Sequence, residues 1–119
     1  GYGGSQRLPR IVGKAKAMEM ILSAKVVTAF EAESIGLVNA VFKQEELMKK
    51  TEEFIANIIS KGALAVASAI ECINASDELS LCSGLAFETK KFGEICGTAD
   101  FKEGTAAFLE KRTANFKGE

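Results

Sequence analysis

Apolar residues recur every three or four positions along most of this chain, which is the spacing of one face of an α-helix. The pattern predicts an opening helix that carries Leu8, Ile11 and Val12 on one face. It predicts further helices over residues 14–24, 44–60, 63–75 and 79–95 and a last one after residue 98. In the segment 44–60 the expected buried stripe consists of Leu47, Phe54, Ile55 and Ile58.

Polar residues at fixed offsets predict where two of these helices begin. Thr28 with Glu31 three residues later is a capping-box pattern, and it indicates a short helix that ends at Gly36. Thr98 is expected to cap the last helix, with Asp100 and Glu103 in its first turn.

One stretch alone has the composition of a strand. Residues 37–42 are apolar, partly β-branched and too short for a helix, so we expect a short extended segment there. With hardly any sheet available, the predicted fold class is mainly α, and a self-contained α/β domain is not expected.

The composition excludes several classes of function but does not identify one. The 119 residues are 47% hydrophobic, enough for a core in one domain or part of one. The net charge of −1 argues against a nucleic-acid-binding protein, and no apolar run is long enough to span a membrane. The absence of histidine excludes Ser-His and Cys-His pairs and histidine metal ligands. Cys72, Cys82 and Cys96 are expected to be buried, reduced thiols.

The glycine-rich stretch Gly1-Tyr2-Gly3-Gly4 is the first candidate for chemistry. Glycine permits tight turns and close approach of a ligand, and a helix start leaves backbone N–H groups without internal partners. Such a place holds an anion or a polarised water, although an ordinary joint between a loop and a helix has the same pattern.

Three longer motifs change this picture. Residues 1–10 resemble the segment Pro-Gly-x-Gly-Gly-Ser/Thr-Gln-Arg-Leu of the enoyl-CoA hydratase (crotonase) family. Residues 29–39 resemble its A-x-x-A-x-x-x-G-L-V segment, and residues 104–112 resemble its closing G-x-x-A-F-x-E-K-R. Three motifs in the right order are specific for the superfamily but only weakly specific for one reaction.

The resemblance implies a fold and a domain division. The chain is expected to form the C-terminal half of a crotonase (ClpP/crotonase-like) protein, a fragment of a longer enzyme. Residues 1–60 are expected to close the spiral core, and residues 61–119 to form the C-terminal helical domain through which the family trimerises.

The resemblance also implies a reaction, the reversible hydration of trans-2-enoyl-CoA to 3-hydroxyacyl-CoA in fatty-acid or butyrate metabolism. Residues 86–88 and 92–94 resemble the short-chain 3-hydroxybutyryl-CoA dehydratases in particular. In the family pattern both catalytic glutamates and the oxyanion hole lie upstream of Gly1, so the isolated chain is expected to be inactive.

By the same resemblance, five residues approach the substrate. The Gly1 N–H helps to hold the reacting water, and Tyr2 borders the acyl chain. Phe108 and Lys111 lie near the coenzyme A nucleotide, and Phe92 lies close to the pantetheine or acyl path. For Phe92 and Phe108 the alternative is core packing at helical spacing. For Lys111, Arg112 and Lys117 the alternative is a solvated basic tail.

The resemblance further implies no cofactor beyond the coenzyme A thioester, a homo-oligomer (a trimer or a dimer of trimers), and a cytoplasmic location, or the mitochondrial matrix in a eukaryote. Two alternatives stay open. One is a non-catalytic helical assembly module, which is expected to self-associate. The other is a different reaction of the superfamily, such as enoyl-CoA isomerisation.

Overall fold

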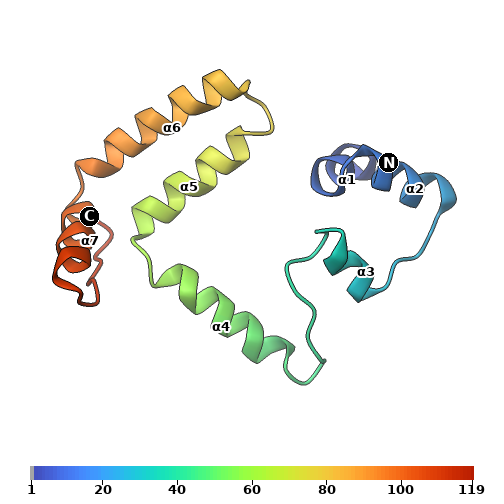
Figure 1. Cartoon of the computed structure of the whole chain (residues 1–119), viewed down its shortest axis with the longest axis horizontal. Coiled ribbons are helices and arrows are strands. Elements are labelled where there is room, and N and C mark those ends of the chain that lie inside the picture. The colour runs from blue at the N-terminus through green and yellow to red at the C-terminus, as the bar shows by residue number, and fades with distance from the viewer. Residues whose placement is uncertain (1) are drawn as a thin grey trace. The chain divides into compact units, whose positions relative to one another are not determined.

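A computed structural model of the chain describes residues 2–119 and consists of helices joined by turns and loops, the longest of which is residues 35–46 (Figure 1). The elements are α1 (Gly4–Val12), α2 (Lys14–Ser23), α3 (Ala29–Ser34), α4 (Leu47–Ile59), α5 (Ala63–Ala75), α6 (Leu81–Cys96) and α7 (Ala99–Glu110). No strand occurs within residues 2–119, which confirms the mainly α prediction.

Contacts between residues divide the chain into two units, one up to Lys50 and one from Thr51 onward. This division falls inside α4. The predicted boundary near residue 60, between a spiral core and an oligomerisation domain, is a functional division that contacts within one chain do not test, and it stays a prediction.

In the first unit, α1 packs against α2, with Ala17 buried. Gly13 has a φ of 80°, a left-handed value that turns the chain between the two helices. The capping box at α3 is present as predicted: the Glu31 N–H donates to Thr28 Oγ1, and the Thr28 N–H donates to Glu31 Oε2.

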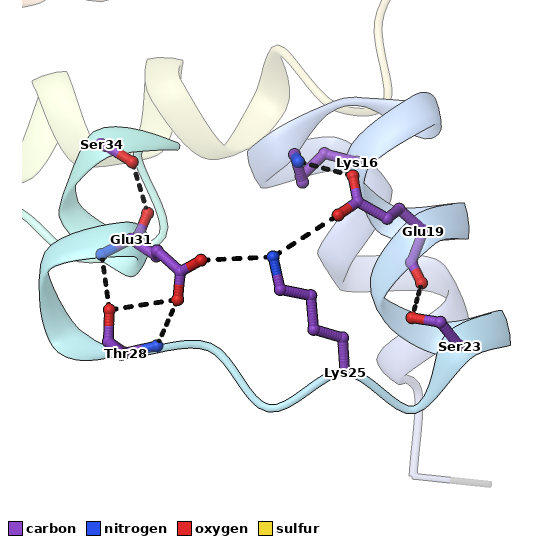
Figure 2. A network of polar contacts seen from close by, with 7 residues as sticks. All are labelled: Lys16, Glu19, Ser23, Lys25, Thr28, Glu31 and Ser34. Atoms are coloured by element: carbon purple, nitrogen blue, oxygen red, sulfur yellow. Dashed lines mark hydrogen bonds and ion pairs between the residues drawn. The ribbon is translucent and has the colours of Figure 1, made fainter.

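Lys25 joins α2 to α3 across the intervening loop. Its ammonium nitrogen lies 3.2 Å from Glu31 Oε1 and 3.7 Å from Glu19 Oε1 (Figure 2). Lys16 pairs with the other oxygen of Glu19 at 2.6 Å. The two carboxylates raise the pKa of Lys25, chiefly through its bond to Glu31. This exposed network fixes the loop that precedes the capping box.

In the second unit, α5 packs against α6 and α6 packs against α7. Lys91 of α6 pairs with Glu71 of α5 at 2.5 Å and lies 5.7 Å from the centre of the Phe87 ring. Phe92 of α6 meets Phe101 of α7 edge to face, with ring centres 6.1 Å apart. This geometry is favoured by the charge distribution of aromatic rings.

Three local predictions need correction. Residues 44–46 form a turn, so α4 begins at Leu47 rather than at Gln44. The helix predicted for 79–95 begins at Leu81, because the Ser80 hydroxyl caps it by accepting the Ser83 N–H. Residues 37–39 form bends and residues 40–42 are irregular, so the segment that was expected to be extended forms no strand.

The expected core is also absent from the described residues. Their buried apolar side chains are Ala17, Ala32 and Ala107, and the stripe predicted for α4 stays open, with Phe54 56% exposed. The prediction of a core was wrong because helices that meet only in pairs leave their other apolar faces open.

Within the described residues, no single helix is long and apolar enough to cross a membrane. Only α4 and α5 taken together reach that length and composition, and they are bent by 103° at the break between them.

Candidate functional site

The end of α7 carries two of the predicted site residues. Lys111 follows the helix with a φ of 55°, in the left-handed region, and this conformation reverses the chain direction. The Lys111 N–H reaches the Phe108 carbonyl, and the Arg112 N–H donates to the Ala107 carbonyl at 3.0 Å. These bonds satisfy carbonyl groups that a helix end otherwise leaves open.

Arg112 holds the residues after this turn against α7. Its Nη1 and Nη2 donate to the two carboxylate oxygens of Glu103 at 2.6 and 2.9 Å, and its Nε donates to Glu110 Oε2 at 2.6 Å. Glu103 Oε1 also accepts the Asn115 N–H at 2.8 Å. The paired guanidinium, together with this backbone bond, lowers the pKa of Glu103 to about 2.

Residues 113–119, which we call the return segment, have a second anchor near the start of α7. Asp100 is buried, and its two carboxylate oxygens accept the N–H groups of Lys117 and Gly118 at 2.7 and 2.8 Å. The Phe116 ring lies over Gly62 and Gly104, where a Cβ would come within 3.5 and 3.2 Å of it. The return segment is therefore fixed at both of its ends.

Phe108 lies in the last turn of α7, and Lys111 is the residue that ends this helix. Phe108 is 83% exposed, so within the described residues it does not pack in a core. Phe92 lies on α6 and is 60% exposed, with Phe101 as its aromatic neighbour. The Lys111 N–H bonds to the Phe108 carbonyl, so the two residues are neighbours along the backbone, and Phe92 contacts the same helix through Phe101.

The glycine-rich stretch belongs to the other unit. Gly1 lies outside the described residues, and the Tyr2 ring is 96% exposed. Gly3 precedes α1 with a φ of 85°, and the Arg7 guanidinium covers it, since a Cβ there would lie 3.1 Å from Arg7 Nη1. Arg7 Nη2 also donates to the Tyr2 carbonyl at 2.7 Å. The positive φ favours glycine at this turn, and no side chain caps α1.

Sequence reasoning missed the pairing of Arg112 with Glu103. The two residues are nine positions apart, beyond the offsets that identify pairs within one helix. A solvated basic tail explained the presence of Arg112 equally well. The signal that could have found the pair was the reversal of the chain just before Arg112, which brings its side chain back over α7.

Other chemistry is limited. No group of three or more potential metal ligands of the His, Cys, Asp or Glu type occurs in the described part of the chain. The three cysteines are free thiols, but the prediction that they are buried is wrong: Cys82 is exposed, and Cys72 and Cys96 are half-buried.

Comparison with known proteins identifies the family. The family described as enoyl-CoA hydratase/isomerase matches residues 1–119, the whole chain. The chain belongs to the enoyl-CoA hydratase/isomerase family. The resemblance indicated by its three sequence motifs is thereby confirmed.

Relatives within this family are close in sequence. The chain is 49% identical over 113 residues to a probable mitochondrial enoyl-CoA hydratase of Dictyostelium discoideum, covering 95% of this chain and 41% of the relative. It is 43% identical over 116 residues to the crotonyl-CoA hydratase of Syntrophomonas wolfei, covering 98% of this chain and 45% of the relative.

A solved enoyl-CoA hydratase from Bacillus anthracis matches all of this chain and 46% of its own, at 39% identity and a TM-score of 0.96. The helices therefore have the fold of the corresponding part of a crotonase-type enzyme, as predicted. The chain spans less than half the length of these relatives.

Proposed function

We propose that the whole protein to which this chain corresponds is an enoyl-CoA hydratase. Water adds across the C2–C3 double bond of a trans-2-enoyl-CoA: C3 gains the hydroxyl oxygen, C2 gains a proton, and the reverse reaction dehydrates a 3-hydroxyacyl-CoA. The observation that carries this proposal is the family match over the whole chain, together with 43–49% identity to relatives named as hydratases. A short acyl chain, as in 3-hydroxybutyryl-CoA, is favoured by the crotonyl-CoA hydratase among them.

The resemblance to the family implies roles for five residues. We assign Phe108 to cover the adenine ring and Lys111 to meet a phosphate of coenzyme A, since an exposed aromatic residue and an ammonium at the end of one helix suit those two partners. We assign Phe92 to the pantetheine or acyl path, Tyr2 to the acyl pocket, and the Gly1 N–H to the reacting water. The acid and base glutamates and the oxyanion hole are not among these residues.

The remaining properties of the whole protein follow from the same assignment. We propose that the coenzyme A thioester is the substrate and that no other cofactor takes part. We propose a homo-oligomer, a trimer or a dimer of trimers. The location is cytoplasmic, or the mitochondrial matrix in a eukaryote, since the relatives include bacterial proteins and a mitochondrial one.

The test is hydration of crotonoyl-CoA, followed as loss of the absorbance of the conjugated thioester. The whole protein is expected to turn over this substrate, and the 119-residue chain is expected not to. Turnover of 3-enoyl-CoA to 2-enoyl-CoA, without hydration, would replace the hydratase assignment by an isomerase.

A second function is favoured by one observation, the exposed apolar faces of the described helices. The chain as it stands acts in this hypothesis as a non-catalytic assembly module of a crotonase-type oligomer. Concentration-dependent association without turnover supports it. Rapid hydration of crotonoyl-CoA by the 119-residue chain itself excludes it.

A further inference from the structure

The turn after α7 has an unusual choice of residue. Lys111 and Ala24 are the residues other than glycine that adopt a positive φ within residues 2–119. Glycine is the usual residue at such a position, because a Cβ is crowded there. Lysine therefore carries a conformational cost at this turn that glycine would not carry.

The contacts around this turn hold it from both sides. On the helix side, the Lys111 and Arg112 N–H groups bond to carbonyls of the last turn of α7. On the other side, the Arg112 guanidinium binds Glu103 with two nitrogens and Glu110 with the third. The planar guanidinium of Arg112 binds two carboxylates and therefore has little freedom to move. This restrains the backbone between the end of α7 and Arg112.

Glu103 contacts both Arg112 and the return segment. Its side chain is a quarter exposed, and it binds Arg112 and the Asn115 N–H at once. Phe108 precedes this turn and Lys111 lies in it, so both are next to the segment that Arg112 and Glu103 hold.

We propose that Arg112 and Glu103 are positioning residues, which fix the end of α7 so that Phe108 and Lys111 meet the nucleotide end of a coenzyme A thioester. This inference rests on the proposed function. Arg112 and Glu103 do not touch the ligand in this account, since each has its polar atoms engaged by the other and by the return segment.

Arg112 and Glu103 carry opposite charges, so variants of the two residues distinguish a positioning role from a direct electrostatic effect on the bound phosphates. If the charge near Lys111 were all that mattered, Glu103→Ala would remove a negative group and strengthen the binding of phosphates. Arg112→Ala would weaken it, and Arg112→Lys would preserve it. Positioning predicts weaker binding in all three variants, because lysine cannot replace the planar guanidinium that binds two carboxylates.

The first experiment uses the whole protein with two substrates, crotonoyl-CoA and crotonoyl-pantetheine, of which the second lacks the nucleotide. For all three variants we expect the KM for crotonoyl-CoA to rise on the order of tenfold, with kcat changed by less than about twofold. The kinetic constants for crotonoyl-pantetheine are expected to stay at their wild-type values. Lys102→Ala, which removes an exposed lysine from the same helix, is the matched control.

The second experiment measures binding of adenosine 3′,5′-bisphosphate, the nucleotide end alone, by calorimetry. The three variants are expected to bind it more weakly than wild type. Lys111→Gly is expected to bind it weakly as well, while the protein unfolds at the same or a higher temperature, since glycine relieves the strain at this turn. This variant keeps the test valid even if Arg112→Ala fails to fold.

Several results would overturn the proposal. These are an equal loss with both substrates, tighter nucleotide binding by Glu103→Ala, and wild-type affinity in Arg112→Lys. Failure of the wild-type protein to bind the bisphosphate would do so too. Absence of crotonoyl-CoA hydration in the wild type, with bisphosphate binding still dependent on Arg112, would instead remove the hydratase assignment and leave the positioning role standing.

Discussion

The Phe116 ring occupies a space that two glycines leave free. It lies 3.5 Å from the Cβ position of Gly62 and 3.2 Å from that of Gly104. Cδ1 and Cε1 on one edge of the ring make these contacts, and the one at Gly104 is closer than an ordinary van der Waals contact. Gly104 lies inside α7, where alanine would otherwise be favoured by about 1 kcal/mol.

The first prediction is that Gly104→Ala destabilises the whole protein, because overpacking against Phe116 costs about 1–3 kcal/mol and exceeds the gain in helix propensity. In a Phe116→Ala background the same substitution is expected to be neutral or stabilising. Unfolding in denaturant measures both, as a double-mutant cycle. A Gly104→Ala effect that is identical in the two backgrounds would show that the ring is not the obstacle.

Glu103 leads to a second prediction at this scale. Its pKa is lowered from 4.5 to about 2 by Arg112 and by the Asn115 N–H, so the folded protein binds fewer protons than the unfolded chain between these two values. The stabilisation is complete above about pH 4.5 and is lost as the pH falls toward 2.

Comparison of wild type with Glu103→Gln checks this dependence. The difference between their free energies of unfolding is expected to be largest near neutral pH and to shrink as the pH falls through 4.5 toward 2. A difference that stays constant over this range would mean that the carboxylate does not interact with Arg112 in solution.

At the scale of the elements, hydroxyl caps mark where helices begin. Thr28 caps α3, Ser80 caps α6 and Thr98 caps α7, each by accepting an N–H three residues later. The cap matters most at α3, which has six residues and lacks the length to persist on propensity alone.

The third prediction follows from this difference in length. Thr28→Ala is expected to cost about 1 kcal/mol and to raise hydrogen exchange at the α3 amides, because it removes the hydroxyl that accepts the Glu31 N–H. Thr28→Ser keeps the hydroxyl and is expected to retain most of the protection. If exchange in α3 were equally fast in both variants, the cap would not be what holds this helix.

Most helices and two of their caps could be predicted from the sequence, and the predictions that were wrong have physical causes. The helices and the caps at Thr28 and Thr98 depend on neighbours a few residues apart, and such patterns are visible in a sequence. Ser80 was missed because Leu79 already fitted the apolar spacing, and the helix was extended past its cap. Residues 37–42 have strand composition, but a strand also needs a partner, which local composition does not reveal.

The candidate site was harder to predict than the helices. Periodicity places Phe108 on one face of α7, but it does not say whether that face is covered. The exposure of Phe108 and the pairing of Arg112 with Glu103 both depend on how the return segment folds back. Only the family motif connected these residues with coenzyme A, and the contact itself remains a proposal.

At the scale of the whole molecule, the dominant property is the lack of a core within residues 2–119. Large apolar side chains such as Leu22, Leu81 and Phe108 are at least 80% exposed, and only alanines are buried among the apolar residues. Burial of apolar surface is the main driving force of folding, at about 25 cal/mol per Å². Helices that bury so little apolar surface therefore depend for their stability on other protein surface that covers them.

The last prediction follows from this property. The 119-residue chain alone is expected to associate as its concentration rises and to unfold without a sharp transition, because exposed apolar faces seek partners and no shared core makes unfolding cooperative. Sedimentation velocity over a concentration series and thermal unfolding by circular dichroism measure the two effects, with the whole protein at equal mass concentration as the control. The whole protein is expected to keep one size and unfold sharply. A monodisperse, cooperatively unfolding 119-residue monomer would mean that its apolar faces close on one another in solution.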